Sequence, residues 1–208
     1  MELMKQRQLI VAVFLYFCDL KTYTMKKSLL AAILIVASIF CEAQTQHMKF
    51  LGIDLNCTIS TFTSKLKGKG FVQDVNNSHE NFVLAKGVFA GEKTKLEVRC
   101  AAKTHLISSV HVCFNMSTSY TYEDLQNRLK DKYGEVFSTN KGLKEEEVYG
   151  IKYVTDYTKW EVNKDEETGA YNIIILAKCS YRSTSPLIIA YIDSRNSQIV
   201  IQEVNSDF

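Results

Sequence analysis

One stretch of the chain, Thr121–Gly134 (TYEDLQNRLKDKYG), specifies both ends and one face of an amphipathic helix. Thr121 can cap the first turn, and Asp124 stands where it completes a capping box. Gly134 supplies the left-handed residue at which helices commonly end. Four apolar or aromatic side chains recur at helical spacing and form one face: Tyr122, Leu125, Leu129 and Tyr133.

A similar pattern occurs earlier, in Thr58–Gly68 (TISTFTSKLKG). Three strand-like runs follow each copy: 81–90, 94–102 and 108–115 after the first, and 152–162, 171–180 and 187–193 after the second. Several runs alternate apolar and polar residues, which is typical of antiparallel strands with one buried and one solvated face. We therefore predict an α+β fold of two tandem α-β-β-β units, with antiparallel sheet covered by one helix per unit. Ile59, Phe62, Leu66, Leu125 and Leu129 are expected to cover the sheet.

The first 43 residues are interpreted as a leader. Residues 1–24 are typical of an over-called translation start, and Met25-Lys26-Lys27 begins a signal peptide that ends at Ala43. An alternative is a lipid anchor on Cys41, but Phe40 is large for the position before such a cysteine. Residues 44–208 then form one exported domain, with repeats at about 48–118 and 119–194 and a tail over 195–208. Within that tail, Ile199–Ile201 fits either an edge strand or a frayed end.

Charge argues against a nucleic-acid partner. Five of the 25 basic and three of the 23 acidic residues precede Gln44, so the exported part carries 20 of each. The balance is uneven along the chain, since residues 44–118 hold nine basic and five acidic side chains. We predict no membrane span once the leader is removed.

The exported part resembles small exported bacterial proteins with a tandem helix-plus-meander layout, similar to the beta-lactamase inhibitor protein and related outer-membrane lipoprotein modules. The resemblance depends on the extended lead-in, the helix ends and the order of elements: Phe50, Gly52, Ile53 and Leu55, then Lys69, Gly70 and Phe71, then Lys132, Tyr133 and Gly134. It implies a binding or assembly role by analogy of fold.

No catalytic constellation is predicted. The sequence lacks the serine-hydrolase, zinc-protease, phosphate-loop and dinucleotide motifs. His105 and His111 are not at a usual ligand spacing, so we expect no metal site and no cofactor, with His105 in a turn and His111 on the sheet surface. The charge runs 145–147 and 165–167 are interpreted as solvated loops. The protein is therefore predicted not to be an enzyme.

Four cysteines remain in the exported part: Cys57, Cys100, Cys113 and Cys179. Three disulfide pairings are open in principle. Alternation places Cys100 and Cys113 on opposite sides of the sheet, so buried free thiols are favoured, especially at Cys100 and Cys179.

Aromatic residues suggest where a partner binds. All nine tyrosines of the exported part follow Ser119, together with the single tryptophan. The candidate binding residues are Tyr157, Trp160, Tyr181 and Tyr191, unless these rings fill the core. We expect an exported, periplasmic or extracellular protein that recognises a protein or peptide through a sheet face. The alternative is a small-ligand or envelope-stress module with a pocket between sheet and helices.

Overall fold

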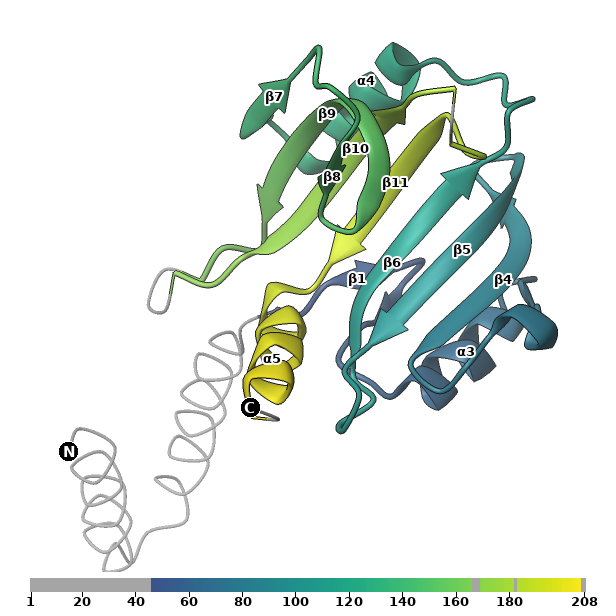
Figure 1. Ribbon diagram of the computed structural model, residues 1–208, viewed down its shortest axis with the longest axis vertical. Coiled ribbons are helices and arrows are strands. Elements are labelled where there is room, and N and C mark those ends of the chain that lie inside the picture. Colours follow the sequence, from purple (N-terminus) through teal and green to yellow (C-terminus); the bar gives the residue numbers. More distant parts are fainter. Residues whose placement is uncertain (1–45, 166–168, 182, 207–208) are drawn as a thin grey trace, which may run out of the picture. The chain divides into compact units, whose positions relative to one another are not determined.

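The computed structural model of the protein describes residues 46–165, 169–181 and 183–206. These residues form an α+β fold built on a nine-stranded sheet with the order β3-β4-β5-β6-β11-β10-β9-β7, in which β8 pairs with β9 (Figure 1). Each described strand pair in it is antiparallel, which confirms the predicted class. The strands are β3 (Val72–Gln73), β4 (Phe82–Phe89), β5 (Glu92–Cys100), β6 (Ile107–Phe114), β7 (Ser138–Asn140), β8 (Glu146–Val148), β9 (Ile151–Val162), β10 (Asn172–Cys179) and β11 (Leu187–Ile192).

The two halves of the sheet meet where β6 pairs with β11, with Val110 opposite Tyr191 and Val112 opposite Ile189. Every residue of both strands is buried. Strands with both faces buried read as continuous apolar runs, and β11 is LIIAYI. Outward from this pair the strand order is β5, β4, β3 on one side and β10, β9, β7 on the other.

Helices α3 (Ile59–Lys67) and α4 (Tyr122–Tyr133) cover one face, here called the inner face. Both predicted caps are confirmed. In α4, Thr121 Oγ1 accepts from Asp124 N at 3.1 Å while Asp124 Oδ2 accepts from Thr121 N at 3.0 Å. In α3, Thr58 Oγ1 accepts from Thr61 N at 3.4 Å. The predicted helix side chains contact this core, with Ile59 only partly buried.

A polar contact fixes α4 on the inner face. Tyr122 Oη lies 2.8 Å from Thr158 Oγ1 on β9, which also accepts from Gln126 Nε2 at 3.0 Å. Thr158 is fully buried, so these bonds satisfy a hydroxyl that would otherwise be costly inside the core.

The opposite, outer face of β10 and β11 is also apolar, and it is covered by the hairpin of β8 and β9. Val148 pairs with Ile151 around the turn residues Tyr149 and Gly150, which both have positive φ, at 50° and 76°. Such a two-residue turn matches the twist of antiparallel strands. Ile151 and Val154 pack into a second buried cluster with residues of β6, β10 and β11. The run 145–147, predicted to be a solvated loop, reaches into strand β8 instead, although the side chains of Glu146 and Glu147 stay exposed as expected.

A third helix, α5 (Ser194–Asn205), follows β11 directly. Both predictions for Ile199–Ile201, an edge strand or a frayed tail, are therefore wrong. The helix begins because Asp193 caps it, with Oδ1 accepting from Asn196 N at 3.1 Å. Asn196 then donates to Leu55 O at 3.2 Å and Ile107 O at 2.8 Å, which ties α5 to the lead-in segment and to β6.

The lead-in segment forms a two-stranded ribbon of β1 (Lys49–Phe50) and β2 (Ile53–Asp54). Between α3 and β4 the chain adds a short 3-10 turn, η1 (Val75–Asn77). The predicted leader lies outside the described residues. Among the helices that the structure describes, none is long and apolar enough to cross a bilayer.

Truncation of Leu129 tests the inner-face packing. Leu129 is 5% exposed, so Leu129→Ala should lower the free energy of unfolding by about 2–5 kcal/mol in denaturant melts. Asn127 is exposed on the same helix, and Asn127→Ala should change it by less than about 0.5 kcal/mol. Equal effects of the two substitutions would contradict the assigned helix face.

Candidate functional site

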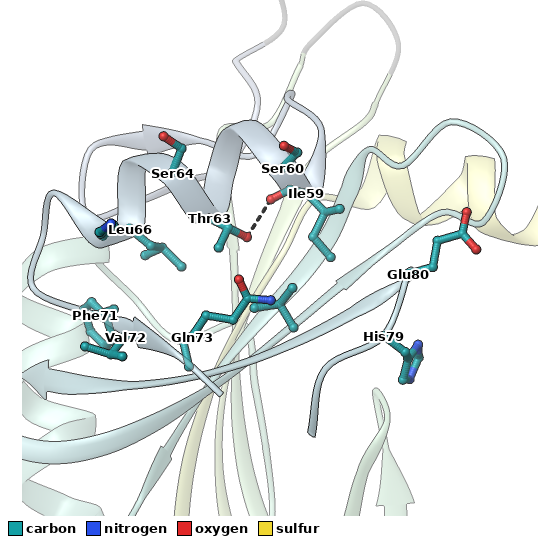
Figure 2. A pocket seen from close by; sticks show the side chains of 13 residues that line it. Ile59, Ser60, Thr63, Ser64, Leu66, Phe71, Val72, Gln73, His79 and Glu80 are labelled. Atoms are coloured by element: carbon teal, nitrogen blue, oxygen red, sulfur yellow. Dashed lines mark hydrogen bonds between the residues drawn. The ribbon is translucent and has the colours of Figure 1, made fainter. Parts of the chain in front are cut away.

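An open groove lies between α3 and the edge of the sheet, with a volume of about 600 Å³. Figure 2 shows the side chains of Thr63 on α3 and Gln73 on β3 pointing toward each other across it. The Thr63 hydroxyl donates to Ile59 O at 2.7 Å within the helix. Leu66 and Phe71 lie toward one end of the groove and His79 toward the other (Figure 2).

The floor of the groove depends on one glycine. A Cβ on Gly87 would come within 2.4 Å of the Phe71 ring, so glycine lets that ring lie against β4. Phe71 is 2% exposed and Leu66 is 1% exposed. Ser60, Ser64 and most other rim residues are polar and exposed, and Val72 is an exposed apolar exception. The groove therefore has an apolar floor and a polar rim, the general character of small-ligand sites.

The outer face of β3, β4 and β5 carries the second candidate surface, which we call the basic face. Its members share that face by strand register and are exposed or half-buried: Val72, Leu84, Lys86, Val88, Lys93 and Lys95. The exposed fractions of Val72 and Val88 are 71% and 58%. Apolar side chains this exposed, set among cations on a sheet face, make this surface a candidate for binding a partner.

Two cations on the basic face stand directly opposite each other. Lys86 on β4 pairs in register with Lys95 on β5. Like charges at directly opposed positions destabilise a sheet. Asp74 partly offsets this repulsion, because its Oδ2 lies 2.9 Å from Lys86 Nζ, and that hydrogen bond lowers the pKa of Asp74. An acidic partner would relieve the rest.

The four aromatic candidates are not brought together. Trp160 and Tyr191 are 0% and 3% exposed in the inner-face core, where Trp160 Nε1 donates to Gly134 O at 3.2 Å and the Tyr191 ring lies 5.2 Å from that of Phe50. Tyr157 is half-buried against the outer-face cluster. Only Tyr181, at 82%, is well exposed. The expected exposure of Trp160 and Tyr191 is therefore corrected, since both rings complete the core as strands β9 and β11 bury their inner faces.

The four cysteines among the described residues carry free thiols, as predicted. Cys100 packs in the inner-face core and Cys113 in the outer-face cluster, which confirms that they face opposite sides of the sheet. Burial raises the pKa of Cys100 and of Cys179 to about 11, so neither thiol is activated as a nucleophile at neutral pH. Within the described part of the chain, no three His, Cys, Asp or Glu side chains are grouped to hold a metal ion.

His47 and Asp193 form the closest histidine–carboxylate pair among the described residues, with Nδ1 and Oδ2 2.8 Å apart. Asp193 is fully buried and also accepts from Met48 N at 3.0 Å, besides capping α5. These bonds satisfy the carboxylate and tie the lead-in segment to α5. The pair therefore has a structural role in joining the ends of the domain.

A third candidate is a cleft of about 330 Å³ on the outer face, where the tip of the β8–β9 hairpin meets β5 and β6. His111 lines it, and its ring is 2% exposed, whereas a sheet-surface position was expected. The hairpin tip buries it, because Gly150 lies against the ring. Burial, with Arg99 nearby, lowers the pKa of His111 to about 3, so the ring is neutral.

The buried neutral ring predicts acid sensitivity. The pKa of His111 is about 3 in the fold and near 6.5 in the unfolded chain, so between these values the unfolded chain binds the extra proton. Stability should fall as the pH drops below about 6.5, by up to roughly 1.4 kcal/mol per pH unit. In urea melts from pH 7.5 to 4.5, His111→Phe should lose less stability than the wild type. Parallel pH profiles would contradict this assignment.

Comparison of the chain with known protein families, with curated proteins and with solved structures gives no match.

Proposed function

We propose that the protein is an exported, non-enzymatic binding protein that recognises an acidic segment of another protein through its basic face. The signal-peptide pattern at 25–43 supports export. The observation that carries the binding proposal is the direct opposition of Lys86 and Lys95, beside exposed Val72 and Val88, on a sheet face that no other described element covers. Cations draw an acidic partner to the face, and apolar side chains supply buried area once it is bound.

This proposal depends on the first half of the outer face, formed by β3, β4 and β5, because that half is exposed. The β8–β9 hairpin covers the apolar outer face of the second half, whereas Lys86, Lys93 and Lys95 in the first half are exposed. A protein partner of the cell envelope fits this surface better than a small molecule does, because the basic face extends over three strands.

We further propose that the two halves arose by duplication of one helix-plus-meander unit. One support is the matching helix caps at Thr58 and Thr121. Another is the strand order: in each half the last of the three strands, β6 or β11, lies at the centre, followed outward by the second, β5 or β10, and the first, β4 or β9. Under this proposal the β8–β9 hairpin is an addition specific to the second unit. It leaves only the first unit with an open outer face.

Photocrosslinking tests the proposed function. A benzoylphenylalanine placed at Val88 in the mature protein should give a discrete protein adduct with the envelope fraction of the source organism. Lys86→Glu with Lys95→Glu should reduce that adduct at least about tenfold, since like-charge juxtaposition costs several kcal/mol at an interface. Lys65→Glu with Lys67→Glu, on exposed positions of α3, should leave it unchanged.

Two outcomes would contradict the proposal: no adduct at Val88, or an equal loss in both charge-reversed variants. The groove between α3 and the sheet edge is the second candidate, favoured by its volume of about 600 Å³ and its apolar floor. Thr63→Phe would fill it. Loss of the adduct in Thr63→Phe but not in the Lys86 and Lys95 variant would place the partner in the groove.

A further inference from the structure

The cleft on the outer face is built from three separate segments. β5 and β6 supply Glu97, Arg99 and His111, the hairpin tip supplies Gly150–Tyr153, and the connection from β10 to β11 supplies Ser183–Ser185. Its volume of about 330 Å³ suits a molecule of a few heavy atoms. The cleft adjoins the basic face but shares none of its six defining residues.

One wall carries a polar atom without a partner. His111 Nε2 is buried and, among the described residues, accepts or donates no hydrogen bond. Buried polar atoms in native proteins are nearly always paired, so an orphaned one beside a cavity points to a bound group. The neutral ring can offer this nitrogen as donor or acceptor, according to its tautomer.

Arg99 is positioned at the cleft by two long hydrogen bonds, which leave part of the hydrogen-bonding capacity of its guanidinium unused. Its Nη2 donates to Gly150 O at 3.3 Å and to Glu97 Oε2 at 3.5 Å, both long contacts for a guanidinium with five N–H donors. Gly150 has a φ of +76°, and a Cβ there would lie 2.4 Å from Arg99 Nη1. Glycine at the hairpin tip thus admits the guanidinium, whose side chain remains 38% exposed.

Charges of both signs line the cleft. Arg99 and Lys152 are cationic, and Glu97, which stands opposite His111 in register, is anionic. A ligand that carried only a carboxylate would be repelled by Glu97, and one that carried only an ammonium would be repelled by Arg99 and Lys152. A molecule that carries both groups on one carbon can place its carboxylate on Arg99 and its ammonium on Glu97, because these two side chains are only weakly paired with each other.

We propose that this cleft binds a small zwitterionic α-amino acid, with its carboxylate on Arg99, its ammonium on Glu97 and a third hydrogen bond to His111. Ser183 and Ser185, which already hydrogen-bond each other, close the far wall around the ligand side chain. The site is independent of the basic face, so either proposal can fail alone.

Nuclear magnetic resonance titration of the mature protein tests this site. Glycine, L-alanine, L-serine and L-threonine are the probes, followed at the His111 Cε1–H and Gly150 amide signals. At least one of the four amino acids should change the chemical shifts of both signals in a saturable manner. L-lactate, which lacks the ammonium, and ethanolamine, which lacks the carboxylate, should bind at least about tenfold more weakly.

Variants that keep the fold decide the outcome. Arg99→Lys and Glu97→Gln should each weaken binding about tenfold or more, and His111→Phe should weaken it about fivefold, as judged at the Gly150 amide. Lys93→Ala, on the basic face outside the cleft, should bind as the wild type does. The proposal is overturned if none of the four amino acids gives a saturable shift, if lactate binds as well as they do, or if both Arg99→Lys and Glu97→Gln retain wild-type affinity.

Discussion

Pairing of β6 with β11 is the interaction on which the rest of the structure depends. It joins a half of four strands, β3 to β6, and a half of five strands, β7 to β11, into one sheet and buries both strands on both faces. Because a buried backbone must satisfy its hydrogen bonds, this central pair admits no gap, and its register sets how the residues of one half align with those of the other. The same rows bring Val98, Val110 and Tyr191 together on the inner face and Glu97, His111 and Ala190 on the outer face.

A continuous sheet has two faces whose apolar side chains must be covered, and the two halves differ in how the outer face is covered. The inner face is covered by α3, α4 and the lead-in segment, apart from the groove beside α3. On the outer face, the β8–β9 hairpin shields the apolar side chains of β10 and β11. In β4 and β5 the residues alternate between buried and exposed, and exposed lysines lie on the outer face. The functional proposals follow from that division. The basic face lies on the uncovered half, and the amino-acid cleft lies where the cover ends, with Arg99 against Gly150.

The sequence predicted the features that depend on local pattern. Capped helices, alternating strands and the opposite facing of Cys100 and Cys113 all follow from spacing along the chain. The pairing of Lys86 with Lys95 could be predicted only if the register of β4 and β5 were known. That register is set by a two-residue turn at Ala90 and Gly91, both with positive φ. The strand runs expected at 81–90 and 94–102 leave three residues between them instead, and a turn of that length would shift the pairing. Local pattern left open whether Trp160 lies at the surface or in the core, because long-range packing decides its burial.

The central claim is that the uncovered half of the outer face is where a protein partner binds. Lysine footprinting measures this directly, by acetylating the mature protein with and without the envelope fraction and quantifying each lysine by mass spectrometry. The account predicts that Lys86, Lys93 and Lys95 become protected together, while Lys65 and Lys67 on α3 keep their reactivity. Unchanged reactivity of the three basic-face lysines, or equal protection of the α3 lysines, would contradict it.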